Sequence, residues 1–395
     1  MPASAFCHKF LRESLASTHQ YRRNALTDMT ISLTRGASLN LTSIGRSLAG
    51  DARVKHKIKR VDRLMGNAAL HREVPALSRD IIGWLIRDMK ECVIAVDWSA
   101  WPTQSFSLLR ASLLADGRAI PLLSLIAEGD KLGNPDLQSR FLDDLAGCMG
   151  DRKVTIVTDA GFRREWFNRV QSHGWHFIGR LRGNGVLKLA GTEEWVTPGQ
   201  LKAGTTPRCA GAARLTRYKK SPAYGYMHVH KRAPKNRHGK KSRDRFFYTR
   251  EEANQSRLAR EPWVLFTSDA ELKPRTVMKL YSRRMQIEQN FRDEKSERYG
   301  MGLRSSYSRS VERMSVLNLL STLCSVVLWL MGYALERQGQ HRFYQANTVQ
   351  NRRVLSYLTL AKNAIRQDPA RVRELDIEEA RAGLAGNYRN IVYVY

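Results

Sequence analysis

Cysteine is scarce in this 395-residue chain, and acidic residues are scarce relative to basic ones. The five cysteines are an odd number with no close pair: Cys7, Cys92, Cys148, Cys209 and Cys324. This pattern excludes a complete intrachain disulfide framework and a Cys-x-x-Cys metal site, and it indicates a reducing compartment. No apolar run typical of a secretory signal stands near Met1, so we expect a cytoplasmic protein.

The shortage of acid leaves the chain strongly basic, with 66 Lys and Arg against 37 Asp and Glu and a formal net charge of +29. Such an excess is the electrostatic pattern of a nucleic-acid binder, with an anionic membrane surface as the alternative partner. Hydrophobic residues make up 42% of the chain, which is ordinary for a globular protein. The length allows two or three domains.

Long hydrophobic runs are also scarce. Residues 314–335 are uncharged and long enough to cross a bilayer. The run contains Asn318 and several Ser and Thr residues, and it follows closely on a charged helix. We therefore predict a buried helix packed on a sheet, with a membrane span as the alternative.

The first 88 residues are predicted to be helical and basic. They include two short helices joined at Gly50, the first with Thr42 as a candidate N-cap. The second helix carries basic side chains that we predict to contact DNA, the alternative being a solvated helix face: Lys55, Lys57, Lys59, Arg60 and Arg63.

Two apolar, β-branched runs lead to aspartates. Residues 92–97 end in Asp97, and residues 153–158 are followed directly by Asp159. Such runs predict buried strands that deliver a carboxylate to the edge of a sheet. A single aspartate after a strand often only caps a loop, so the pair carries the prediction.

The elements around these aspartates follow a definite order. A hairpin is predicted at the Asp116-Gly117 turn, between residues 106–114 and 119–127, and an amphipathic helix at 134–149. A helix at 162–172 and a strand at 176–181 come after the second aspartate. The predicted order is thus strand, hairpin, helix, strand, helix and strand, with the acids at these places. This order matches a ribonuclease-H-like arrangement, in which a later helix supplies a third acid.

About 90 residues interrupt this alternation before the third acid. They contain short β-like runs at 194–196, 225–230, 246–249 and 263–267. A basic loop at 231–245 has eight Lys and Arg and one Asp. We predict that this loop, including Lys240 and Lys241, contacts a DNA backbone, the alternative being a solvated loop.

The third acid, Glu288, lies on a predicted helix with Tyr281, Arg284 and Lys295. At 100° per residue these four side chains share an arc of roughly 60°. Nearby Asp293, Glu294 and Glu297 lie off that face. Three carboxylates suit two divalent cations, so Asp97, Asp159 and Glu288 are predicted to hold two Mg²⁺ ions, with Mn²⁺ as a substitute. Tyr281, Arg284 and Lys295 are then phosphate-binding candidates.

The spacing Tyr-x2-Arg-x3-Glu-x6-Lys resembles the YREK signature of the DDE transposases of bacterial insertion sequences. The resemblance is to the cut-and-paste family that includes the transposase of the insertion sequences flanking the tetracycline-resistance transposon. It extends from about residue 25 to 360, with Asp97-Trp98-Ser99 and Asp159-Ala160-Gly161-Phe162 among the matching features.

The resemblance implies a DNA-cutting and DNA-joining enzyme. One acidic triad would nick the element end, form and open a DNA hairpin, and join the 3′-OH to target DNA. Trp263 matches the position that stacks a flipped base, and Met285 the position that wedges it out; the alternative for Trp263 is a core tryptophan. The implied partners are terminal inverted repeats, target DNA, a second copy of the chain and a host DNA-bending protein, in the bacterial cytoplasm near the nucleoid.

The expected fold is α/β, a ribonuclease-H-like core interrupted by a β-rich insertion and flanked by helical regions. The expected segments are a DNA-binding region 1–88, core 89–184, insertion 185–268, core 269–340 and a helical region 341–395. The final residues 387–395 are predicted as an edge strand or a contact surface. A nuclease without strand transfer, a non-catalytic DNA-binding regulator and a membrane protein are the alternative functions.

Overall fold

The computed structural model describes residues 2–101, 105–216, 221–231, 261–298, 300–346, 348–349 and 351–394. The predictions for the loop lysines Lys240 and Lys241 and for a strand at 246–249 lie outside the described residues. The chain forms two compact units. Unit 1 comprises residues 1–154 and 284–395, and unit 2 comprises residues 155–283.

Unit 1 begins with the predicted helices. They are α1 (Pro2–Ser14), α2 (Gln20–Thr34), α3 (Leu41–Ser47), α4 (Val54–Met65) and α5 (Ala68–Leu85). The N-cap of α3 is Asn40, whose side chain accepts the Ser43 amide, so the prediction of Thr42 was wrong by two residues. Thr42 instead donates its hydroxyl to the Asn40 side chain.

The strands of unit 1 are β1 (Glu91–Trp101), β2 (Phe106–Leu113) and β3 (Ile120–Glu128), paired antiparallel in the order β3-β2-β1. The predicted hairpin is therefore confirmed. Strand β1 is longer than expected, and Asp97 lies within it, opposite Arg110 of β2, instead of ending it. Helix α6 (Pro135–Met149) follows, with Asn134 as its side-chain cap.

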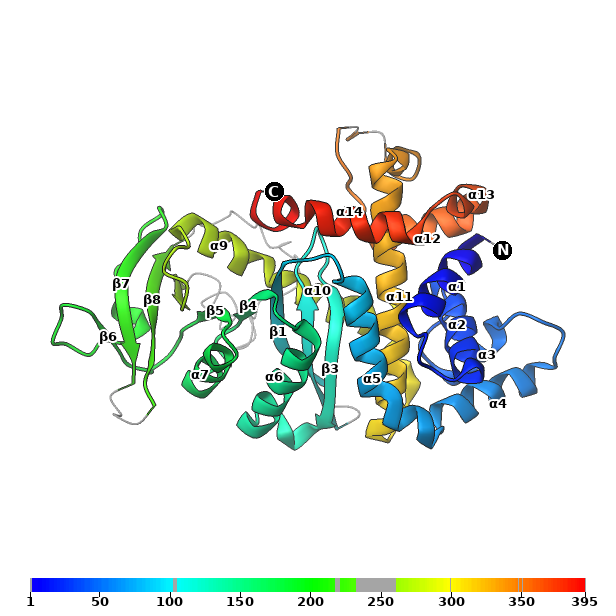
Figure 1. Ribbon diagram of the computed structural model, residues 1–395, viewed down its shortest axis with the longest axis horizontal. Helices are drawn as coiled ribbons and strands as arrows, with labels where there is room; N and C mark the ends of the chain where they lie inside the picture. The colour runs from blue at the N-terminus through cyan, green and yellow to red at the C-terminus, as the bar shows by residue number, and fades with distance from the viewer. Residues whose placement is uncertain are drawn as a thin grey trace, which may run out of the picture. The chain divides into compact units, whose positions relative to one another are not determined.

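Helix α11 (Val311–Arg337) is the centre of unit 1. It is long and apolar enough to cross a membrane by length and composition, but 94% of its most apolar window is buried inside the structure. It packs against β3, α2 and α5 and, as Figure 1 shows, is crossed by α12 (Tyr357–Gln367). The prediction of a buried helix packed on a sheet is confirmed.

The C-terminal region is helical to its last described residues. Helices α13 (Pro369–Arg373) and α14 (Ile377–Arg389) are followed by a π-helical turn, Asn390–Val394. The prediction of an edge strand here was wrong. Burial of Tyr388, whose hydroxyl accepts the Val93 amide at 3.0 Å, fixes α14 beside β1.

Unit 2 is built on a mixed sheet. In chain order its strands are β4 (Lys153–Thr158, which belongs to this unit from Thr155 on), β5 (His176–Arg180), β6 (Leu187–Leu189), β7 (Arg208–Leu215), β8 (Ala223–His230) and β9 (Trp263–Thr267). They lie in the order β4-β5-β9-β8-β7-β6, with β4 and β5 parallel and the following pairs antiparallel. Helix α7 (Arg164–Ser172) joins β4 to β5, and α9 (Pro274–Arg283) follows β9. The predicted strand at 194–196 is only an isolated bridge from Val196 to Leu187.

The predicted single helix around Glu288 is two helices. Helix α9 ends at Arg283, and α10 (Met285–Lys295) begins after Arg284, where the chain passes from unit 2 to unit 1. The Ile287 amide bonds to the Arg284 carbonyl three residues earlier, at 3.0 Å. A tight first turn of this kind departs from 100° per residue, so the arc calculated through Tyr281 does not hold.

Short 3₁₀ turns complete the two units at Gly129–Lys131, Pro198–Gln200, Leu303–Ser306 and Gln340–Phe343.

Candidate active site

One face of β1 carries the residues that contact α10. Side chains alternate along a strand, so Asp97, Ser99 and Trp101 lie on the same face. At the start of α10, Arg284 reaches Asp97, and at its end Lys295 reaches Ser99 and Trp101. The helix therefore runs along the strand for most of its length.

Arg284 joins two of the three predicted catalytic acids. Its Nη1 lies 3.0 Å from Oδ2 of Asp97, and its Nη2 lies 2.5 Å from Oε1 of Glu288. The side chains of Arg284 and Asp97 are 10% and 13% exposed, whereas Glu288 is 40% exposed. The two acids, here called the carboxylate pair, thus share one cation at the surface of unit 1.

Lys295 lies at the other end of α10. Its Nζ donates to Oγ of Ser99 at 2.7 Å and to the Ala100 carbonyl at 2.9 Å, and it lies 5.1 Å from the centre of the Trp101 ring. Burial lowers the pKa of Lys295 to about 8, while the adjacent Glu294 acts in the opposite direction. A lysine with a pKa near neutrality is typical of functional sites.

The other acids close to Glu288 in sequence have partners of their own. Asp293 accepts Nε of Arg118 at 2.6 Å, and Glu297 accepts the Ser305 hydroxyl at 2.7 Å. Glu294 is fully buried. Glu288, by contrast, pairs with Arg284 beside Asp97.

A buried network under α10 was not predicted from the sequence. Arg110 and Glu294 form an ion pair of 2.9 Å in which each side chain is 1% exposed. Asn318 of α11 donates to Oε1 of the same carboxylate at 2.9 Å. Because Arg110 is the cross-strand partner of Asp97, this network fixes α10 over the strands that hold the site. The alternation of Asp97, Ser99 and Trp101 was the available signal for this face.

Asp159 belongs to unit 2 and follows β4 directly, as predicted. Its Oδ1 accepts the Gly161 amide at 2.8 Å, which orients the carboxylate in a turn. Phe162 and Trp166, with ring centres 4.5 Å apart, are buried beyond that turn.

Tyr281 and Trp263 meet within unit 2. Their rings contact edge to face, with centres 4.9 Å apart, and Tyr281 is 4% exposed. Burial lowers the pKa of Arg180, and a hydrogen bond with Tyr281 counteracts that effect. Trp263 stands first in β9 and is half-buried, so part of its surface remains accessible.

Met285 is the first residue of α10 and is 49% exposed, which is unusual for a large apolar side chain. Its sulfur lies 3.7 Å from Nη2 of Arg284. It therefore lies at the surface directly beside the carboxylate pair.

The predicted DNA-contacting residues of α4 divide into two groups. Lys57 donates to the Leu48 carbonyl at 2.8 Å, and Arg60 pairs with Asp28 at 2.6 Å. The remaining three are exposed and have no ion-pair partner within the described part of unit 1: Lys55, Lys59 and Arg63.

The carboxylate pair has the donor chemistry of a divalent-cation site. Hard carboxylate oxygens suit Mg²⁺ or Mn²⁺, and both acids already converge on one positive group. Among the residues that the structure describes, no three His, Cys, Asp or Glu side chains form a ready-made cluster. Asp97 and Glu288 fit such an ion as two of its ligands, provided that Arg284 moves aside.

Comparison with known proteins gives a structural and a family result. A cryo-electron-microscopy structure of the piggyBac transposase synaptic complex with hairpin DNA is similar, with 10% identity and a TM-score of 0.44 over 94% of this chain and 76% of that chain. No curated protein matches the chain at a significant level. The family described as the transposase DDE domain matches residues 88–326, more than half of the chain, and the chain therefore belongs to that family and is a DDE transposase.

Proposed function

We propose that the chain is a cut-and-paste insertion-sequence transposase of the YREK type, with Asp97, Asp159 and Glu288 as its acidic triad. The observation that carries the proposal is the convergence of Asp97 and Glu288 on Arg284 in a chain of the DDE family. Asp159 is included because it follows β4 in the matched region with its carboxylate fixed by the Gly161 amide. These residues suit hydrolysis of phosphodiesters and transfer of a 3′-OH end to target DNA.

The triad would hold two divalent ions, with Mg²⁺ as the natural choice. Such ions activate the attacking oxygen and stabilise the leaving oxygen in phosphoryl transfer. Arg284, released from the carboxylate pair, can then donate two parallel hydrogen bonds to a phosphate. Lys295 supplies a second positive charge further along α10, and Tyr281 supplies a hydroxyl.

We assign the two halves of the catalytic core to residues 89–184 and 269–340, with a ribonuclease-H-like arrangement and a β-rich insertion at 185–268. The order β1, hairpin, α6, β4, α7, β5 supports this assignment. The charge of +29 and the exposed basic side chains of α4 support binding of double-stranded DNA at the terminal inverted repeats. We expect a homodimer to hold two ends in the bacterial cytoplasm, with a host DNA-bending protein as a further partner.

Trp263 and Met285 are proposed to support a hairpin intermediate. A hairpin requires a sharply bent DNA end, and base flipping costs a few kcal/mol that stacking on an aromatic ring can offset by about 1–3 kcal/mol. The half-buried Trp263 ring and the exposed Met285 side chain are suited to stack and to wedge a base, respectively.

The test uses purified protein, Mg²⁺ and a labelled duplex that spans the junction of the inverted repeat and its flanking DNA. Products are resolved on a denaturing gel for the wild type, Asp97→Asn and Trp263→Ala. We expect a nick and then a hairpin in the wild type, neither with Asp97→Asn, and a nick with little hairpin with Trp263→Ala.

Two results would change the assignment. Nicking that never leads to a hairpin would favour a nuclease on the same fold. Binding without cleavage in either Mg²⁺ or Mn²⁺ would favour a DNA-binding regulator.

A further inference from the structure

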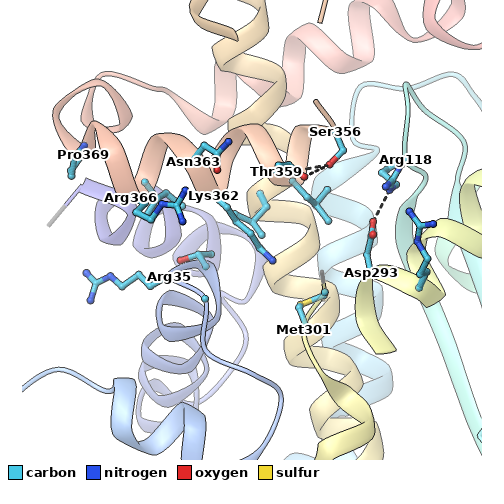
Figure 2. Close-up of a pocket in the computed structure, with 17 residues that line it drawn as sticks. Arg35, Arg118, Asp293, Met301, Ser356, Thr359, Lys362, Asn363, Arg366 and Pro369 are labelled. Carbon is cyan, nitrogen blue, oxygen red and sulfur yellow. Dashed lines mark hydrogen bonds and ion pairs between the residues drawn. The ribbon is translucent and has the colours of Figure 1, made fainter. Parts of the chain in front are cut away.

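A second basic site lies within unit 1, in a cavity of about 820 Å³. Its walls come from the end of α2, the end of α10, α11 and α12. As Figure 2 shows, Lys362 extends from α12 into this space toward Met301, and Asp293 lies across from it, joined to Arg118. None of the proposed catalytic residues lines the cavity.

The charges of the cavity are unbalanced. Five cationic side chains line it and only one acid does: Arg35, Arg118, Arg292, Lys362 and Arg366 against Asp293. That acid is already engaged by Arg118 at 2.6 Å. Within the described part of the chain, Arg292, Lys362 and Arg366 form no ion pair. Like charges gathered in this way repel one another unless an anion accompanies them.

Helix α12 directs its polar face to the cavity. Lys362 and Arg366 are four residues apart, as are Thr359 and Asn363, so each couple lies on one side of the helix. These four side chains, with Ser356 at the helix start, offer ammonium, guanidinium, amide and hydroxyl donors. Lys362 and Asn363 are half-buried, whereas Arg366 is exposed.

We propose that this cavity is a binding site for phosphate groups, separate from the catalytic site and independent of the proposed reaction. A guanidinium fork, an ammonium and hydroxyl donors together are the chemistry that recognises phosphate oxygens. The volume lies within the range of ligand pockets and exceeds the needs of a single ion, so a chain of phosphates fits better than one. The ligand is either the backbone of bound DNA or a free oligophosphate such as a nucleoside triphosphate.

The test measures binding of inorganic triphosphate to the full chain by calorimetry. The variant Lys362→Gln/Arg366→Gln removes two charges from the cavity. The control Arg337→Gln/Arg373→Gln removes two exposed charges on α11 and α13. Neither of these two side chains lines the cavity. Lys362→Arg/Arg366→Lys keeps the charge, and thermal denaturation checks that every variant is folded.

We expect the cavity variant to bind triphosphate at least about tenfold more weakly than the control, and the charge-conserving variant to bind it normally. Equal binding by the cavity variant and the control would overturn the proposal. Asp97→Asn should bind triphosphate like the wild type, so a failure of the proposed catalytic function is distinguishable from a failure of this site.

A second arm separates the two sources of phosphate. The affinity for a duplex is measured as a function of salt concentration for the same variants. Loss of two DNA phosphate contacts lowers the slope of log K against log salt by about 1.8 relative to the control. A lower slope together with weaker triphosphate binding assigns the site to the DNA backbone. An unchanged slope with weaker triphosphate binding assigns it to a free oligophosphate.

Discussion

Replacing Arg110 with methionine would leave the Glu294 carboxylate buried without its counter-ion. Both side chains are 1% exposed and 2.9 Å apart, so water cannot replace the lost partner. The Asn318 amide would remain, but it donates to only one oxygen of the carboxylate. Loss of one member of a buried ion pair typically costs about 3–5 kcal/mol.

The double change Arg110→Met/Glu294→Leu should cost much less than either single change. It removes both charges together, and apolar replacement of a whole buried pair is often neutral or stabilising. The remaining loss should come mainly from Asn318, which is buried and would lose the Glu294 oxygen that it donates to, at a cost of about 1–3 kcal/mol. Ser124 would lose Arg110 as its partner, but it is only half-buried, so water can replace that hydrogen bond.

Urea denaturation followed by circular dichroism measures these effects as changes in the midpoint at constant slope. The expected result is a large loss for each single variant and partial recovery in the double variant. Additive losses would refute the reasoning, because independent sites add and a coupled buried pair does not.

Three further predictions concern other parts of unit 1. Burial lowers the pKa of Lys295 from 10.5 to about 8, so kcat/KM for cleavage should fall as the pH rises through about 8. The variant Lys295→Arg should show no such fall. Identical pH profiles for the two proteins would refute a role of the charged Lys295 in cleavage. Because the unfolded chain keeps that proton up to about pH 10.5, the wild type should also gain stability relative to Lys295→Arg between pH 8 and 10.5. Gly332→Ala should lower the free energy of unfolding by about 1–3 kcal/mol, because the added carbon would lie 2.3 Å from the Tyr357 carbonyl oxygen. Gly386→Ala, whose added carbon would have nothing within 4 Å, should raise it by about 0.4–1 kcal/mol. Thermal denaturation measures both changes. Arg284→Gln should slow cleavage but tighten Mn²⁺ binding in calorimetry, because it removes the guanidinium that competes with the metal ion for the carboxylate pair. An unchanged Mn²⁺ affinity would contradict this competition between Arg284 and the metal ion.

The elements that were predicted well have strong local signals. Strands β4 and β9 have the predicted bounds because each is a short apolar, β-branched run. The hairpin was evident from its Asp-Gly turn, where Gly117 adopts a positive φ of 70°. By contrast, β7 was missed because its sequence has little large apolar alternation and contains a bulge between Cys209 and Gly211.

The parts of the site that could not be predicted depend on long-range contacts. Arg110 and Glu294 are 184 residues apart, and an arginine in so basic a chain would ordinarily be taken for a surface or DNA-contacting residue. The break at Arg284 has no proline or glycine to mark it. The C-terminal helix is fixed by the tertiary contact of Tyr388 with Val93, which overrides the β-propensity of its aromatic sequence.

The central proposal is that Asp97, Asp159 and Glu288 are the acidic triad of metal-dependent DNA cleavage. Its most direct test is the single-turnover rate of Mg²⁺-dependent cleavage for Asp97→Asn, Asp159→Asn and Glu288→Gln. Glu297→Gln is the matched control, because that acid is bound to the Ser305 hydroxyl away from the site.

The account predicts that each triad variant cleaves more than about 100-fold more slowly than the wild type and that the control cleaves normally. Mutation of residues that only hydrogen-bond to metal ligands already lowers activity by about 10–100-fold, so loss of a ligand itself should cost more. Cleavage at the wild-type rate by any one of the three triad variants would contradict the account.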